Sequence, residues 1–353
     1  MRGYKRKGIS PRCMIKLDIR KAYDSVGWEA IIQIMELLSF PHQFVNWVKQ
    51  CITTPTYSIQ LNGEDYGYFQ RKRGIRQGDP ISPLLFVLIM EYLSRLLQQL
   101  KHNKLFRFHP MCGTLKLINL CFADDLIVVC RADENSIQCV MKVLHKFQRT
   151  IGLSINKAKS QIIFGGVDKS TQDRLQKMID IPIGEFPLRY LRSPITAARV
   201  SEKECERLVQ NITSKINSWA VKHLSYAGRC RLVGSVLQGI MTFWCKLFII
   251  PTKVMKRVQS ICRNFLWGAT ASYTKRPLVN WEEVCLPKTY GGLGLRNMEL
   301  WNRAYIYNYW WDVANDKKNL WVKWIHERYI KNDIESCAVR SERLLFLLEE
   351  DYS

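Results

Sequence analysis

The stretch CFADDLIVV, residues 121–129, places two acids between two runs of residues that favour β-strands. The first run is LKLINLCF and the second is LIVVC, and only Ala123, Asp124 and Asp125 separate them. This spacing predicts a tight hairpin with carboxylates at its tip. A lone Asp-Asp pair between strands is most often a polar turn. The hairpin by itself therefore does not indicate a catalytic site.

A third acid, Asp18, lies near the end of another apolar run, residues 13–19. This run leads into KAYDSVGWEAIIQIMELL, whose apolar positions follow helical spacing. We therefore expect a strand that carries Asp18 near its end and leads into a helix. Asp18 could lie close to the hairpin tip if this strand is a neighbour of the hairpin strands. Clustered carboxylates repel one another unless a cation neutralises them. Mg²⁺ suits such a cluster because it takes oxygen ligands and binds through a few carboxylates plus substrate phosphates.

Periodicity predicts further elements on both sides of these acids. TYSIQLNGEDYGYFQ, residues 56–70, alternates around an Asn-Gly turn and predicts a second hairpin. Helices are expected from about 83 to 100 and over 133–150, and GLSINKAKS, residues 152–160, predicts a turn before the strand SQIIFGG. From about Ser201 the chain reads as mainly helical, so we expect a domain boundary there.

Composition favours a polyanionic partner. The 353 residues carry a formal net charge of +22, with aromatic residues among the Lys and Arg, which suits nucleic-acid backbones and bases. Twelve cysteines without a CxxC pair suggest free thiols in a reducing compartment. We find no secretion signal and no run long enough to span a bilayer, so we expect a nuclear or cytoplasmic protein without a membrane partner. Protein partners are not indicated.

The order of these motifs resembles the reverse transcriptase family. LDIRKAYDSVGW, GIRQGDPISPLLF, CFADDLIVV, GLSINKAKS and LRYLRSPI are similar to its successive palm motifs. Within the family, SPRCMIKLDIRKAYDSV, SYAGRCRLVGSVL, FLWG and PKTYGGLGLRNMELWN resemble LINE-type (non-LTR) elements of plant genomes. The resemblance implies an α+β fold: a mostly antiparallel palm over 1–200, a helical thumb-like region over 201–270 and a helical extension over 271–353. It also implies a truncated fragment with the fingers largely missing.

The resemblance assigns roles to particular residues. Asp18, Asp124 and Asp125 would be catalytic and would bind two Mg²⁺ ions, with Mn²⁺ as a substitute. The substrates would be an RNA template, a DNA primer and deoxynucleoside triphosphates. The other implied roles are general acid for Lys159, nucleotide binding for Ile19, Tyr23, Arg76, Gln77 and Gly78, and primer or template contact for Phe122, Ala123, Leu188, Arg189, Tyr190 and Leu191.

Plain structural interpretations remain open beside these roles. Tyr23 could be a core tyrosine, Lys159 a solvated lysine and RQGDP an ordinary turn before a helix. Arg192 stands where relatives usually carry glycine. Basic residues of the helical part suit contact with the backbone of a nucleic-acid duplex, although runs of charged residues are usually solvated faces. The basic residues meant are Lys215, Lys222, Arg229, Arg231, Lys253, Lys256, Arg257 and Arg263.

Three functions compete at this point. The leading one is an RNA-directed DNA polymerase that extends a DNA primer on an RNA template. The second is a catalytically inactive remnant that still binds nucleic acid through its basic residues. The third is a group II intron maturase-like protein, which shares the palm. The LINE-like segments after Ser201 argue against the third.

Overall fold

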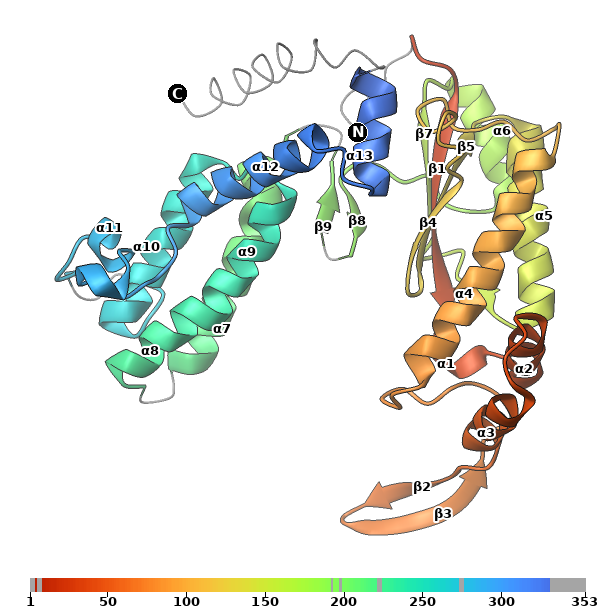
Figure 1. The fold of residues 1–353 in the computed structure, drawn as a ribbon, viewed down its shortest axis with the longest axis horizontal. Helices are drawn as coiled ribbons and strands as arrows, with labels where there is room; N and C mark the ends of the chain where they lie inside the picture. Colours follow the sequence, from red (N-terminus) through yellow and green to blue (C-terminus); the bar gives the residue numbers. More distant parts are fainter. Residues whose placement is uncertain are drawn as a thin grey trace. The chain divides into compact units, whose positions relative to one another are not determined.

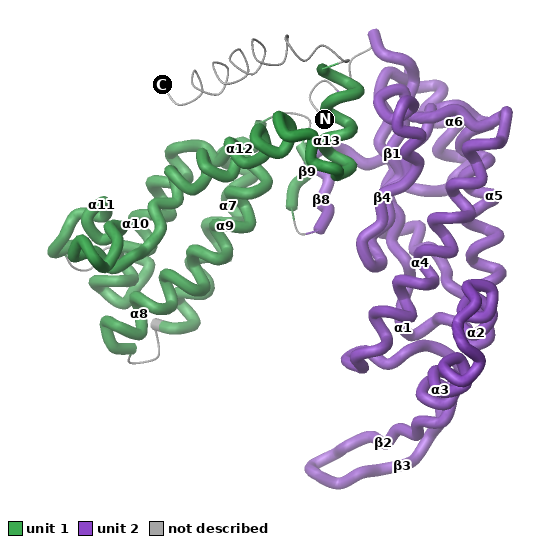
Figure 2. The backbone as a smooth tube through the Cα atoms, viewed as in Figure 1, with its two compact units in different colours: residues 1–2, 192–353 green, residues 3–191 purple. Residues whose placement is uncertain are grey.

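The computed structural model describes residue 4 and residues 8–191, 193–196, 199–220, 224–272 and 276–330. The chain divides into two compact units, which separate between Leu191 and Arg192 (Figure 2). We call residues 3–191 the N-terminal unit and residues 192–353 the C-terminal unit. Each unit has a hydrophobic core of its own.

The N-terminal unit is built on an antiparallel sheet. Its central strand β1 (Arg12–Arg20) pairs on one side with β5 (Asp125–Arg131), which pairs in turn with β4 (Asn119–Phe122). On the other side β1 pairs with β6 (Ser154–Ile155) and β7 (Gln161–Gly165). The predicted mixture of helices and mostly antiparallel sheet is confirmed for this unit.

One face of this sheet packs on the core. Alternate residues of β1, namely Cys13, Ile15, Leu17 and Ile19, are all buried there. Since side chains alternate between the two faces of a strand, the residues between them belong to the opposite face. Figure 1 shows α4 and α5 running alongside the sheet, and α4 packs against β4 while α5 packs against β5.

The expected helix over residues 21–38 is interrupted. Lys21 has a left-handed backbone (φ 45°), and Val26 and Gly27 are extended between two helices. The backbone N–H of Gly27 donates instead to the carbonyl of Ile151, at 2.9 Å.

The helices of this unit are α1 (Ala22–Ser25), α2 (Trp28–Leu37), α3 (His42–Thr53), α4 (Ser82–Gln98), the 3-10 helix η1 (Gln99–His102), α5 (Glu134–Ile151) and α6 (Lys169–Ile179).

The predicted second hairpin is present. It comprises β2 (Thr56–Leu61) and β3 (Glu64–Gln70), joined by Asn62 and Gly63, whose φ values of 52° and 89° are those of a tight hairpin turn. Almost every side chain of the two strands is exposed, Tyr68 to 78%. The two strands form a sheet of their own (Figure 1).

The N-terminal unit ends with β8 (Leu188–Tyr190), and β9 (Ser193–Ile195) opens the C-terminal unit, which is otherwise helical where described. Residues predicted as thumb and as extension, such as Val258 and Leu295, share one core. The helices are α7 (Glu202–Ala220), α8 (Tyr226–Leu232), the π-helix η2 (Val233–Leu237), α9 (Gln238–Leu247), α10 (Thr252–Gly268), α11 (Trp281–Val284), the 3-10 helix η3 (Lys288–Tyr290), α12 (Met298–Ala314), α13 (Leu320–Ile325) and the π-helix η4 (His326–Ile330).

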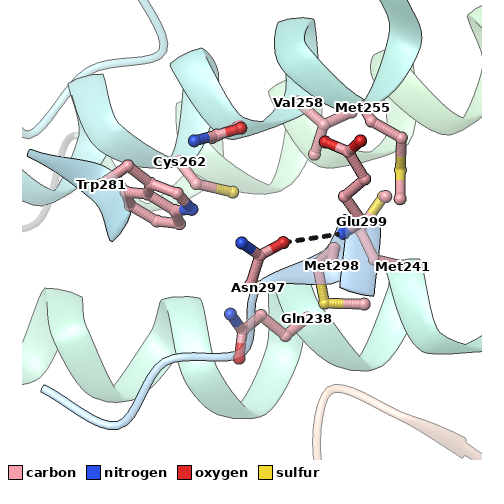
Figure 3. A pocket seen from close by; sticks show the side chains of 10 residues that line it. Gln238, Met241, Met255, Val258, Cys262, Trp281, Asn297, Met298 and Glu299 are labelled. Atoms are coloured by element: carbon pink, nitrogen blue, oxygen red, sulfur yellow. Dashed lines mark hydrogen bonds between the residues drawn. The ribbon is translucent and has the colours of Figure 1, made fainter. Parts of the chain in front are cut away.

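A small pocket lies inside the C-terminal unit, between α9, α10 and the start of α12 (Figure 3). Its walls include Met241, Met255, Met298 and Cys262, and its volume is about 20 Å³. A space of this size holds about one water molecule and cannot take a nucleotide. At its edge Asn297 caps α12 by accepting the Glu299 N–H, the contact dashed in Figure 3.

Within the described residues, no helix is both long and apolar enough to cross a bilayer.

Candidate active site

Asp18 and Asp125 are direct partners in the antiparallel register of β1 and β5. Phe122 of β4 is in turn the partner of Asp125. Directly opposed residues of neighbouring antiparallel strands project from the same face. The three side chains therefore form one row across three strands, on the face away from the core that buries Leu17 and Ile19. The Phe122 side chain is 62% exposed at the end of this row.

The turn between β4 and β5 separates the two neighbouring acids. Ala123 takes a left-handed backbone (φ 51°), and Asp124 is exposed and outside the strand register. The structure thus brings Asp18 and Asp125 together and leaves Asp124 at the tip of the turn. No group of three or more His, Cys, Asp or Glu suited to a metal ion occurs among the residues that the structure describes.

Lys16 belongs to the same face of β1 as Asp18, two residues earlier. Its Nζ lies 3.6 Å from Asp125 Oδ1 and donates a hydrogen bond to the Arg189 carbonyl at 2.8 Å. Sequence reasoning missed this residue. The period of two along the strand that carries Asp18 could have identified its face, although not its partners.

The motif GLSINKAKS holds the main chain of Asp18. The Asp18 N–H donates to Ser160 Oγ at 3.1 Å, and the Asp18 carbonyl accepts from the Asn156 N–H at 2.8 Å. The Ser160 hydroxyl, which is fully buried, donates to the Asn156 carbonyl at 2.8 Å. Ser160 and Asn156 were also missed as site residues. Lys159, the predicted general acid, is exposed on the same turn.

The predicted nucleotide residues are spread over two segments. Tyr23 is half-buried and stacks on Phe86, with ring centroids 5.0 Å apart, while its carbonyl accepts from the Ile75 N–H at 2.7 Å. Ile19 is buried in the core, so only its backbone could serve a ligand. Gly74 fits closely against α1, because an added Cβ would lie 2.6 Å from the Asp24 carbonyl oxygen.

These contacts tie the start of the RQGDP loop to the helix that follows Asp18. Beyond that anchor the loop is open: Arg76, Gln77 and Gly78 are all exposed, and Gly78 has a φ of 94° that favours glycine. The side chain of Asp79 accepts from the Ile81 N–H at 3.3 Å just before α4 begins.

Strand β8 carries the predicted primer or template residues. Leu188 is buried, Arg189 is exposed and Tyr190 is half-buried. Burial, and after it the nearby charge of Asp125, raises the pKa of the Tyr190 hydroxyl. Leu191 has a left-handed backbone (φ 49°). Arg192, which departs from the family pattern, lies outside the described residues.

Several of the basic residues predicted to contact a duplex have partners within the C-terminal unit. Lys253 pairs with Glu202 at 3.5 Å and Arg257 pairs with Glu206 at 2.7 Å. Arg229 donates to the carbonyls of Leu266 and Leu224 and so has a structural contact. Of the others, Lys215, Arg231 and Lys256 are exposed, Arg263 is half-buried and Lys222 lies outside the described residues.

Comparison with known proteins identifies the family of the motifs. The family profile described as reverse transcriptase (RNA-dependent DNA polymerase) matches residues 2–224. A putative ribonuclease H protein of Arabidopsis thaliana is 32% identical over 40% of this chain and 23% of its own length. A retrovirus-related Pol polyprotein of the retrotransposable element R2 from Popillia japonica is 29% identical over 41% of this chain and 23% of its own.

A longer match extends over about three quarters of the chain. A 149 kDa protein of the transposon TX1 from Xenopus laevis is 25% identical over 74% of this chain and 20% of its own length. The matching segments therefore span about a quarter or less of these relatives, at 23%, 23% and 20%.

Proposed function

The chain belongs to the reverse transcriptase family, and from that premise we propose that it is the RNA-directed DNA polymerase domain of a non-LTR retrotransposon. The row formed by Phe122, Asp125 and Asp18 carries the proposal, because it combines two partly exposed acids and an exposed ring on one sheet face. The similarity to the R2 and TX1 proteins supports the retrotransposon origin. A plant LINE-type source is the finer proposal, which the similar Arabidopsis protein supports.

The acids fit the divalent metal ions that polymerases of this family use. Asp18 and Asp125 offer carboxylate oxygens on one face, and exposed Asp124 directly precedes Asp125 in the turn. Mg²⁺ commonly binds proteins through only a few carboxylates, with waters and substrate phosphates as its other ligands. Two bound ions would stabilise both the attacking and the leaving oxygens of an in-line displacement. Ser160 and Asn156 would keep the Asp18 main chain fixed throughout.

The remaining residues suit a primer, a template and an incoming deoxynucleoside triphosphate. Exposed Phe122 would pack beside the primer end, together with Ala123 and β8. Tyr23 lies on the segment directly after Asp18, and its ring would support the sugar of the nucleotide. The exposed loop from Arg76 to Gly78 offers a cation, an amide and an unobstructed backbone to phosphate or template. Lys159 would donate a proton to the leaving pyrophosphate.

Incorporation of deoxynucleotides tests the proposal. Purified chain is incubated with Mg²⁺ and a poly(rA)/oligo(dT) primer–template, alongside the variants Asp18→Asn and Asp125→Asn. The matched control is Asp173→Asn, because Asp173 is a partly exposed acid on α6 that pairs with Lys169. We expect incorporation by the wild type and the control, and none by the two site variants. Salt-sensitive duplex binding without incorporation by the wild type would instead support a binding remnant.

A further inference from the structure

Lys16 connects two parts of the N-terminal unit that the proposed function assigns to different tasks. Its ammonium donates to the Arg189 carbonyl of β8 at 2.8 Å and lies 3.6 Å from Asp125 Oδ1. β8 is predicted to hold the primer, and Asp125 is predicted to hold a metal ion. The sequence places Lys16 and Arg189 173 residues apart, so this link arises only from the fold.

We propose that Lys16 is a positioning residue that fastens β8 to the carboxylate pair, and so sets the place of the primer end relative to Asp125. The inference rests on the proposed polymerase function. Lys16 does not itself touch substrate in this role. It acts through the main chain of Arg189 on one side and through the Asp125 carboxylate on the other.

The chemistry of lysine suits this double contact. An ammonium group has three donors and no acceptor, so one proton can serve the carbonyl while the positive charge faces the carboxylate. The Lys16 side chain is only 20% exposed and that of Asp125 only 29%. Water therefore screens this pair less than it screens an ordinary surface ion pair.

β8 is short and pairs with β9, so a side-chain contact to its main chain adds to that restraint. It has three residues, and its exposed Arg189 and half-buried Tyr190 contribute little to the core. Tyr190 lies close enough to Asp125 for that charge to affect its hydroxyl. A tether at the Arg189 carbonyl thus restrains β8 through the same ammonium group that pairs with Asp125.

Hydrogen exchange measures the tether without any requirement for activity. Amide exchange of residues 188–191 is compared in the wild type, Lys16→Met and Lys16→Arg. Lys104→Met is the matched control, because Lys104 is exposed in the loop after η1. We expect exchange of this segment to rise about tenfold in Lys16→Met, as befits loss of one charge-assisted hydrogen bond. We expect little change in Lys104→Met, and an intermediate rise in Lys16→Arg, which keeps the charge.

Steady-state kinetics then test the consequence for the primer. In Lys16→Met the KM for primer–template should rise about tenfold, while the KM for deoxynucleotide stays near the wild-type value. Unchanged exchange of residues 188–191 in Lys16→Met overturns the proposal, and so does raised exchange with an unchanged KM for primer–template. A wild type that incorporates nothing refutes the polymerase function instead, and the exchange result still decides whether Lys16 tethers β8.

Discussion

The hydroxyl of Ser160 accepts the backbone N–H of Asp18 at 3.1 Å. The same hydroxyl donates to the Asn156 carbonyl, so a single buried side chain joins the strand end that carries Asp18 to the turn between β6 and β7. An acid that must hold a metal ion benefits from a main chain fixed on both sides, and here both the N–H and the carbonyl of Asp18 are engaged.

Removing this hydroxyl should damage stability and activity together. In Ser160→Ala a partly buried N–H loses its partner, which costs about 1–3 kcal/mol. We expect the free energy of unfolding in urea to fall by that amount, and nucleotide incorporation to fall with it. Ser154→Ala is the control, because Ser154 is an exposed serine on neighbouring β6. Equal effects of the two substitutions would contradict this role for Ser160.

Replacing Asp18 by asparagine should abolish Mg²⁺ binding at this site without lowering the stability of the protein. Asp18 and Asp125 are like charges directly opposite one another, an arrangement that destabilises a sheet by about 0.2–1 kcal/mol. Without Mg²⁺, Asp18→Asn should therefore melt at or slightly above the wild-type temperature. Added Mg²⁺ should raise the melting temperature of the wild type and leave that of Asp18→Asn unchanged, since a ligand stabilises only the form that binds it. An equal Mg²⁺ response in both proteins would rule out Asp18 as a ligand.

The stability of the N-terminal unit should depend on the protonation of His109. This ring is buried against Tyr4, its Nδ1 accepts the Met111 N–H, and burial, with the nearby Arg12 charge second, lowers the pKa of His109 to about 4. The unfolded chain binds this proton near pH 6.5, so the contribution is complete above about pH 6.5 and is lost as the pH falls toward 4.

The loss amounts to about 2–3 kcal/mol across that window. Urea unfolding at a series of pH values measures it directly. His109→Gln keeps an acceptor for Met111 but cannot titrate, so its stability should decline less between pH 6.5 and 4. Parallel declines in the wild type and the variant would show that other groups, such as carboxylates, account for the acid sensitivity.

Two glycines of the C-terminal unit should respond to alanine in opposite directions. A Cβ at Gly292 would overlap the Leu286 carbonyl oxygen, so Gly292→Ala must displace backbone and should cost about 3 kcal/mol. A Cβ at Gly239 in α9 would meet nothing within 4 Å, so Gly239→Ala should stabilise the helix by about 0.5–1 kcal/mol. Thermal unfolding followed by circular dichroism distinguishes the two, and a neutral Gly292→Ala would show that the loop can relax.

Strands and helices were predicted correctly where the sequence has one clear local pattern of apolar or β-favouring residues. A short apolar run predicted β1, two β-favouring runs predicted the hairpin of β4 and β5, and alternation predicted the hairpin of β2 and β3. Helical spacing predicted α4 and α5. The interruption between α1 and α2 was missed, because the apolar period continues through Val26 and Gly27 while the Gly27 N–H is bound to Ile151 on a distant helix.

The site was harder to predict than the elements. Sequence alone could not decide which of Asp124 and Asp125 faces Asp18, because the left-handed turn at Ala123 sets that register. Lys16 and Ser160 were missed because their partners lie far away along the chain. The roles of Lys159, Tyr23 and the loop from Arg76 to Gly78 remain predictions.

The hairpin of β2 and β3 has a consequence for the protein in solution. Among the described strands, β2 and β3 each leave one edge without a partner, and they expose apolar side chains such as Ile59, Tyr68 and Phe69. One copy therefore offers another a template for strand addition. The net charge of +22 opposes such encounters at low ionic strength, and salt screens that repulsion. Concentrated salt removes nucleic acid from a basic protein, and it should therefore also promote self-association of this one. The salt concentration used in purification must be high enough for the first effect and low enough to avoid the second.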